Sequence, residues 1–184
     1  MQAENSKITI HMVSSLDGFI AKRDGNVSWM HSKDHYAKGV ELTEEYISEF
    51  LKSIDCYIMG SRTYEHAVEL GWPYGEVPVF VLTKRGLTSD KKNVQFLSGN
   101  LNEIVQSQLK GQYKNIWMVG GAMLTKEFLQ TGLADEINIT MVPILLGNGT
   151  LFFDYIDKEI SLHLKDVSAY KDGMVEMVYE INKE

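Results

Sequence analysis

Three short and almost continuously apolar runs, at 54–59, 77–82 and 116–119, constrain most strongly what this chain can fold into. A strand that is exposed on one side alternates apolar and polar residues, so strands without alternation are covered on both faces. Stretches with helical spacing of apolar residues separate the three runs. The first two-thirds of the chain therefore predicts the order strand, helix, strand, helix, strand.

The predicted helices carry start and stop signals. Thr43 can accept a hydrogen bond from a first turn whose two acidic residues suit the helix dipole. Asn100 and Glu103 are spaced as in a capping box, and Gly132 ends the third helix. The apolar stripes are Tyr46, Ile47, Phe50 and Leu51; Leu101, Ile104, Val105 and Leu109; and Leu124, Phe128 and Leu129.

Strand patterns also occur at both ends of the chain. Residues 7–13 and 137–141 alternate apolar and polar side chains, and Asp172-Gly173 forms a tight turn between two further strands. The strand at 175–181 is apolar on both faces, which is typical of an internal strand or of an edge between two copies of the chain.

These elements predict an α/β fold in three layers, with a mostly parallel mixed sheet flanked by helices and an antiparallel C-terminal hairpin. A purely parallel, doubly wound sheet is the alternative, and the Asp-Gly turn argues against it. No repeat, low-complexity tract or linker interrupts the sequence, so we expect a single domain over 1–184.

The composition excludes several classes of protein. The 184 residues carry a net charge of −7, which argues against a nucleic-acid binder and against a polybasic membrane clamp. No apolar run approaches the ~20 residues of a membrane span, and residues 1–7 lack the apolar stretch of a signal peptide. We therefore expect a soluble cytoplasmic protein with neither nucleic-acid nor membrane partners.

Cysteine and histidine give no sign of a metal site. Cys56 is the single cysteine and lies in an apolar run, which favours an inert core thiol. The histidines show no ligand spacing, so we expect no metal and expect them at the surface or in loops: His11, His31, His35, His66 and His163. A G-x-S-x-G nucleophile elbow is also absent from the sequence.

Two strand-to-helix turns carry residues suited to a ligand. The first, 59–65, places Gly60, Ser61, Arg62 and Thr63 at a helix start, where N–H groups and a guanidinium suit a phosphate. The alternative is a capped helix in which Arg62 pairs with a nearby glutamate.

The second turn contains the pair Gly120-Gly121 directly after a predicted central strand. Ligands of open α/β sheets gather at such carboxyl ends, although the G-x-G-x-x-G fingerprint is absent. A tight turn that needs positive φ is the alternative. Two such turns in one small sheet together indicate a nucleotide site.

In order along the chain, these and other segments resemble the dihydrofolate reductase-like superfamily. The similarity is closer to its branch with the reductase domain of bacterial riboflavin biosynthesis, the RibD C-terminal domain, and its stand-alone relatives. The matching segments are 15–21 with Trp29, 58–65, 71–74, 79–83, 119–121, 134–136 and 142–149.

The resemblance implies a dihydrofolate reductase-like fold and a reductase that uses NADPH to reduce a small pterin- or pyrimidine-type heterocycle, such as dihydrofolate or 5-amino-6-(5-phosphoribosylamino)uracil. It implies that the turn at 60–63 binds phosphates of the cofactor and that the turn at 120–123 lies under its pyrophosphate. It also implies that the strand end at 82–84 flanks adenine and the 2′-phosphate, and that residues 20–21 lie beside nicotinamide. These cofactor-binding residues are Gly60, Ser61, Arg62, Thr63, Gly120, Gly121, Ala122, Met123, Leu82, Thr83, Lys84, Ile20 and Ala21.

The resemblance also implies a proton-donating carboxylate after the tryptophan segment. Asp34, five residues after Trp29, fits this catalytic role by spacing, with Glu44 or Glu45 as substitutes and solvated helix-start acids as the alternative. The H-x-E and P-C-x-x-C elements of the zinc deaminase often fused to riboflavin reductases are absent.

Family resemblance further favours a homodimer. Two non-enzymatic interpretations remain beside the reductase: an NADP-binding module without a proton donor, and a dimeric interaction domain.

Overall fold

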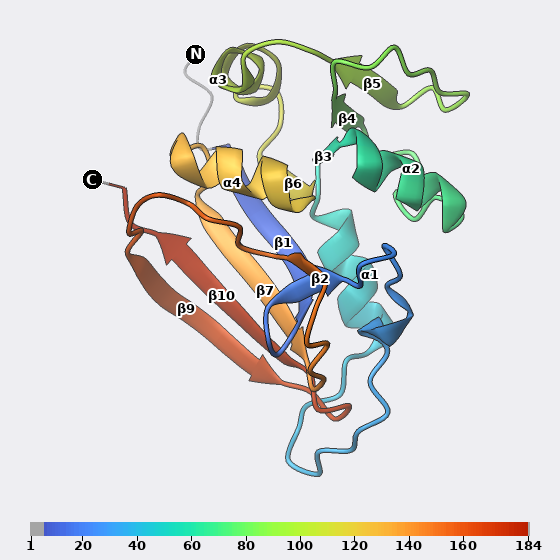
Figure 1. Ribbon diagram of the computed structural model, residues 1–184, viewed down its shortest axis with the longest axis vertical. Coiled ribbons are helices and arrows are strands. Elements are labelled where there is room, and N and C mark those ends of the chain that lie inside the picture. Colours follow the sequence, from blue (N-terminus) through green and yellow to red (C-terminus); the bar gives the residue numbers. More distant parts are fainter. Residues whose placement is uncertain (1–5, 184) are drawn as a thin grey trace.

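The computed structural model describes residues 6–183 and contains an eight-stranded mixed sheet (Figure 1). The five pairings from β5 to β7 are parallel, and β10 and β9 add an antiparallel hairpin. This arrangement confirms the predicted mixed sheet, and the purely parallel alternative is wrong. In spatial order the strands are β5 (Val94–Leu97), β4 (Val79–Leu82), β3 (Cys56–Gly60), β6 (Asn115–Gly120), β1 (Lys7–Ser15), β7 (Glu136–Val142), β10 (Val175–Ile181) and β9 (Leu162–Ala169).

The helices begin where the sequence signals predict. Thr43 Oγ1 accepts a hydrogen bond from Tyr46 N, and Asn100 Oδ1 accepts one from Glu103 N. The helical elements are η1 (Ser28–Met30), α1 (Glu44–Lys52), α2 (Ser61–Glu69), α3 (Leu101–Ile104), its π-helical continuation η2 (Val105–Leu109) and α4 (Ala122–Gln130). A small second sheet pairs β2 (Phe19–Ala21) with β8 (Thr150–Leu151).

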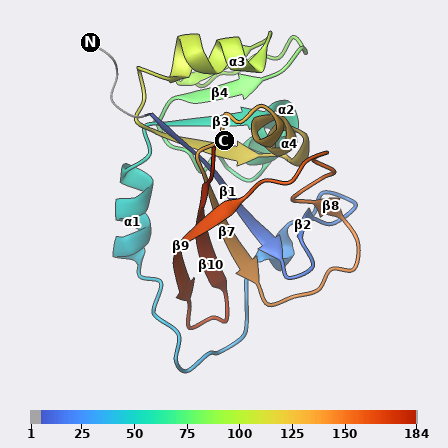
Figure 2. The same cartoon turned by 90° about the vertical axis from the view of Figure 1, so that its left-hand side faces the viewer.

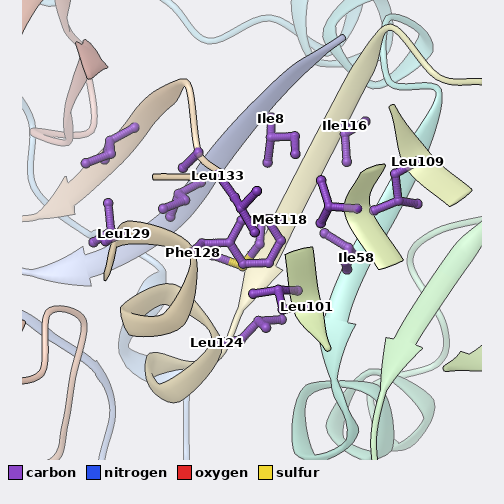
Figure 3. Close-up of a cluster of buried hydrophobic side chains, with 14 of the residues drawn as sticks. Ile8, Ile58, Leu101, Leu109, Ile116, Met118, Leu124, Phe128, Leu129 and Leu133 are labelled. Atoms are coloured by element: carbon purple, nitrogen blue, oxygen red, sulfur yellow. The ribbon is translucent and has the colours of Figure 1, made fainter. Parts of the chain in front are cut away.

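Helices cover the sheet on both sides. The apolar stripes of α3, η2 and α4 bury against alternate residues of the central strands, with Phe128 at 0% exposure (Figure 3). We call this side the α4 face and the opposite side the α1 face. On the α1 face, Tyr64 of α2 packs on β3 and β4, and Phe50 of α1 packs on Trp117. Figure 2 shows α1 and α4 on opposite sides of β1 and β7.

Several details differ from the sequence-based expectations. The stripe of α1 packs through Phe50, whereas no residue of α1 is buried and Tyr46, Ile47 and Leu51 are exposed. Strand 175–181 is internal, between β7 and β9, so it is not an edge.

Cys56 is buried as predicted, and burial raises the pKa of its thiol to about 12.

Two findings concern membrane-spanning helices and metal-binding groups. None of the helices within residues 6–183 is long and apolar enough to cross a membrane. The same part of the chain holds no group of three or more His, Cys, Asp and Glu side chains arranged to bind a metal ion.

Candidate functional site

The two glycine-bearing turns lie side by side at the carboxyl edge of the sheet. β3 ends at Gly60 and its neighbour β6 ends at Gly120, with Met59 paired to Gly120. A Cβ added to Gly60 would lie 4.0 Å from the carbonyl oxygen of Gly120. A Cβ added to Gly121 would lie 3.6 Å from Thr63 Oγ1. One ligand can therefore contact both turns.

Each turn leads into the N-terminus of a nine-residue helix. Gly60 is the N-cap of α2 and Gly121 that of α4, and neither N-cap has a side-chain hydrogen bond. The first-turn N–H groups of both helices therefore lack this partner. Two adjacent helix N-termini place N–H donors and positive dipole ends together, which suits an anion with more than one phosphate.

Gly120 must be glycine because of its conformation and its neighbour. Its φ is +120°, and an added Cβ would lie 2.9 Å from Sδ and 3.0 Å from Cε of Met12 on β1. The peptide bond to Gly121 is cis. The sequence showed the glycine pair, and the structure shows that the backbone here packs directly on the neighbouring strand.

Basic side chains gather beside the first turn. Gly60 pairs with Leu82, so the end of β4, with Thr83 and Lys84, adjoins α2. Arg85 donates two hydrogen bonds to Glu65, at 2.8 and 2.7 Å, and these bonds lower the pKa of the Glu65 carboxyl, with further lowering by the charges of Arg85 and Arg62.

Arg62 is exposed at this helix start, and among residues 6–183 it takes part in no ion pair. The glutamate pairing that the sequence offered as the alternative for Arg62 is made by Arg85 instead. The guanidinium of Arg62 is therefore available to a ligand at the two turns.

Ile20 and Ala21 lie on β2, which follows β1 at the same edge. Ile20 is 8% exposed and belongs to the buried cluster of the α4 face. The loop before β2 is tied down by Asp17, which accepts hydrogen bonds from Ser15 Oγ at 2.6 Å and from the backbone N–H groups of Leu146 and Gly147. The bond from Ser15, followed by those from Gly147 and Leu146, lowers the pKa of the Asp17 carboxyl. β2 is thereby held beside the end of β1.

The carboxylate candidates lie elsewhere. Asp34 is exposed and contacts the turn of the β9–β10 hairpin, where a Cβ on Gly173 would lie 2.5 Å from its Oδ2. Its N–H donates to Ser32 Oγ, which in turn donates to the carbonyl of Asp172. Glu44 and Glu45 are exposed in the first turn of α1. The structure thus groups the cofactor candidates at 60–63, 82–84 and 120–123 around the glycine turns, places Ile20 and Ala21 on β2, and places Asp34 at the β9–β10 turn.

A row of buried polar side chains, which the sequence analysis missed, lies on the α1 face. Asn138 and Thr140 of β7 are 7% and 8% exposed, and His11 of β1 pairs in register with Asn138. Within the described residues, His11 Nδ1 and Asn138 Oδ1 have no hydrogen-bond partner. His11 stacks on Trp117, so the expectation of a surface or loop position is wrong for this histidine. The alternation of apolar and polar residues in 7–13 was the signal available in the sequence, because it places His11 on the polar side of its strand.

This row continues to a tyrosine–carboxylate pair under the start of α1. Tyr170 is 4% exposed, and its hydroxyl donates to Glu176 Oε1 at 3.2 Å. Burial, followed by the charge of Glu176, raises the pKa of Tyr170. Glu176 pairs in register with Thr140, so the pair lies at the carboxyl end of β7.

Comparisons with known proteins show the family of the chain and solved structures with the same fold. The family described as RibD C-terminal domain matches residues 6–176. YwjB of Bacillus subtilis (strain 168), an uncharacterized protein, is 30% identical over 89% of this chain and 92% of its own length. Two solved structures share the fold.

The first, from Shewanella sp. PV-4 and named after riboflavin biosynthesis, has a TM-score of 0.80 and 26% identity over 96% of this chain and 99% of its own. The second is dihydrofolate reductase from Enterococcus faecalis, complexed with NADP(H) and RAB-propyl. It has a TM-score of 0.61 and 17% identity over 96% of this chain and 97% of its own, so the likeness shows the fold alone.

Proposed function

Because the chain belongs to the family of RibD C-terminal domains, we propose that it is an NADPH-dependent reductase that acts on a small pterin- or pyrimidine-type heterocycle. One observation carries the proposal: two uncapped helix N-termini, after Gly60 and Gly121, adjoin at one edge of the sheet. The folds of the dihydrofolate reductase-like neighbours, one of them complexed with NADP(H), support it.

In this proposal the N–H groups at the starts of α2 and α4 bind the phosphates of one dinucleotide. Arg62 forms charge-assisted hydrogen bonds with a phosphate, and Lys84 lies where a 2′-phosphate adjoins the end of β4. These local cations offset the net charge of −7, which repels a polyanion. Ser61, Thr63, Leu82, Thr83, Gly120, Ala122 and Met123 complete the proposed phosphate and adenosine contacts.

NADPH, when bound, supplies the hydride, and the protein orients the reacting groups. Ile20 and Ala21 hold the nicotinamide end and exclude water there, since Ile20 is buried on the α4 face. Asp34 is the proposed proton donor, with Glu44 or Glu45 as substitutes. Asp34 lies between Trp29 and α1, and the two glutamates lie in the first turn of α1.

The proposal is tested by titrating NADPH into the protein and following nicotinamide fluorescence. We expect Arg62→Ala to weaken NADPH binding about tenfold or more, since a charge-assisted hydrogen bond contributes ~1.5–3 kcal/mol. Lys92→Ala removes an exposed positive charge elsewhere and serves as the matched control, with an expected change of less than twofold. Absence of wild-type binding at millimolar NADPH contradicts the proposal.

A non-enzymatic NADP-binding module is the second candidate, and the exposed position of Asp34 at the hairpin favours it. The two are separated by NADPH oxidation with dihydrofolate and a panel of pteridines and pyrimidines. Turnover that is lost in Asp34→Asn while NADPH binding persists supports the reductase. NADPH binding without turnover on any acceptor favours the module.

A further inference from the structure

Polar side chains on three neighbouring strands form one line across the α1 face, which we call the polar row: Glu176 of β10, Thr140 and Asn138 of β7, and His11 of β1. Glu176 pairs in register with Thr140, and Asn138 pairs with His11. Glu176 and Asn138 are diagonal neighbours across an antiparallel pair, and such positions lie roughly 7–8 Å apart. The polar row is therefore continuous from β10 to β1.

The polar row contains buried hydrogen-bonding atoms that have no partner in the described part of the chain. Asn138 is 7% exposed, and neither its Oδ1 nor His11 Nδ1 has a hydrogen-bond partner within residues 6–183. A buried polar atom without a partner is destabilising, and nearly all such atoms are paired in native proteins. Two of them on neighbouring strands therefore indicate a ligand that supplies the missing groups.

Tyr170 fixes Glu176 at the other end of the polar row. The Tyr170 hydroxyl donates to Glu176 Oε1 at 3.2 Å, which leaves Oε2 for a further donor. Gly39 packs so closely on the backbone of Tyr170 that a Cβ would not fit there. Glu176 takes part in no ion pair among residues 6–183. The row thus ends in an oriented carboxylate that can accept hydrogen bonds from a ligand.

The Tyr170 end of the polar row meets the surface at the start of α1. Burial, the charge of Glu176 and the nearby hydroxyl of Tyr46, in this order, raise the pKa of Tyr170, so Tyr46 lies close to it. Tyr46 is itself 52% exposed. None of the residues of α1 is buried, and Phe50 is the one that meets the ring of His11. A small molecule can therefore reach the row beside Tyr46.

We propose that the polar row binds the ring of the substrate and that Glu176 accepts hydrogen bonds from two adjacent N–H groups at the ring's edge. The substrate then carries a 2-amino-4-oxopyrimidine edge, as in a pterin, and is not a pyrimidinedione. This inference rests on the proposed reductase function and assigns the ring-binding carboxylate to strand β10. Asp34 keeps its proposed role as the proton donor.

The chemistry of the polar row distinguishes the two ring types. An ionised carboxylate only accepts hydrogen bonds, and Asn138 Oδ1 is also an acceptor. The 2-amino group and the neighbouring ring N–H of a 2-amino-4-oxopyrimidine point in the same direction, so one carboxylate can accept from both. A pyrimidinedione has a carbonyl oxygen in place of the amino group, and this oxygen would face the negative charge of Glu176. A site of this kind therefore selects the amino compound.

Equilibrium dialysis without NADPH tests the assignment with two ligands, 6-methylpterin and 6-methyllumazine, which differ in carrying an amino group or an oxygen at C2. We expect the wild type to bind 6-methylpterin about tenfold or more tightly than 6-methyllumazine. Glu176→Gln is expected to weaken 6-methylpterin binding about tenfold or more and to remove this preference. Glu180→Gln, at an exposed position on the same face of β10, is the matched control and is expected to bind both ligands as the wild type does.

Tyr170→Phe is a second variant that retains the buried ring and removes the hydroxyl that orients Glu176. We expect it to reduce the preference for 6-methylpterin while NADPH binding stays unchanged, a pattern that a loss of folding would not produce. Thermal unfolding verifies that each variant is folded. A preference that is unchanged in both Glu176→Gln and Tyr170→Phe overturns the proposal.

Equal binding of the two ligands by the wild type, or binding of neither, also overturns the proposal. Titration of NADPH into the same preparations separates this result from a failure of the proposed function. A wild type that binds NADPH and neither ligand contradicts the role of the polar row alone. A wild type that binds 6-methylpterin through Glu176 but does not bind NADPH contradicts the reductase and supports the polar row as the ring site.

Discussion

The imidazole of His11 is enclosed between the sheet and α1. It stacks on Trp117 at 4.4 Å between ring centroids and meets the edge of Phe50 at 5.3 Å. Burial disfavours the charged imidazolium and lowers the pKa of His11 to about 4. Because the unfolded chain binds this proton near pH 6.5, stability is complete above that pH and is lost as the pH falls toward the folded pKa.

We therefore expect the free energy of unfolding to fall by roughly 3 kcal/mol between pH 7 and pH 4 on account of His11 alone. Urea unfolding at a series of pH values measures this dependence. His11→Phe retains an aromatic ring against Trp117 and is expected to remove the part of this pH dependence that comes from His11. An unchanged pH dependence in His11→Phe contradicts this assignment.

Among the elements, α3 illustrates how a short helix is fixed by its cap and its apolar stripe. Asn100 caps the first turn, and Leu101, Ile104, Val105 and Leu109 are all buried. We expect Asn100→Ala to lower the free energy of unfolding by ~1 kcal/mol, since the Glu103 N–H loses its acceptor. Asn102→Ala, on the exposed side of the same helix, is the control and should change stability far less. Equal effects of the two substitutions in denaturant melts would show that the cap is unimportant.

The elements that the sequence predicted are those whose signals are local. Asn100 and Thr43 act within one turn, and the apolar runs at 54–59 and 116–119 mark strands by their own composition. β5 was missed because its four residues alternate weakly and gain burial from partners distant in sequence, such as β4 and Tyr64 of α2. The exposure of α1 and the burial of His11 depend on which sheet positions lie under a helix. The alternation in 7–13 placed His11 on one side of its strand but carried no information about the helix that covers that side.

The candidate site likewise combines features that have a local sequence signal with features that depend on contacts between distant segments. The turns at Gly60 and Gly120 could be found from the sequence, because glycine at a strand end is a local signal. Their proximity depends on the strand order, in which β3 and β6 are neighbours although residues 61–114 lie between them in the sequence. The hairpin position of Asp34 likewise depends on where β9 and β10 join the sheet.

At the scale of the whole molecule, the sheet has two distinct ends. The end formed by β5, β4, β3 and β6 carries the glycine turns, at the carboxyl ends of β3 and β6, and the cations Arg62, Lys84 and Arg85. The other end is the exposed strand β9 (Figure 1).

The most direct test of the account is amide hydrogen exchange with and without NADPH. If one dinucleotide is held by both turns, the amides at the starts of α2 (61–64) and α4 (122–125) must slow together, with one common NADPH midpoint. Slowing at one helix start alone, at two different midpoints, or at neither would contradict the claim that the turns after Gly60 and Gly121 form a single site.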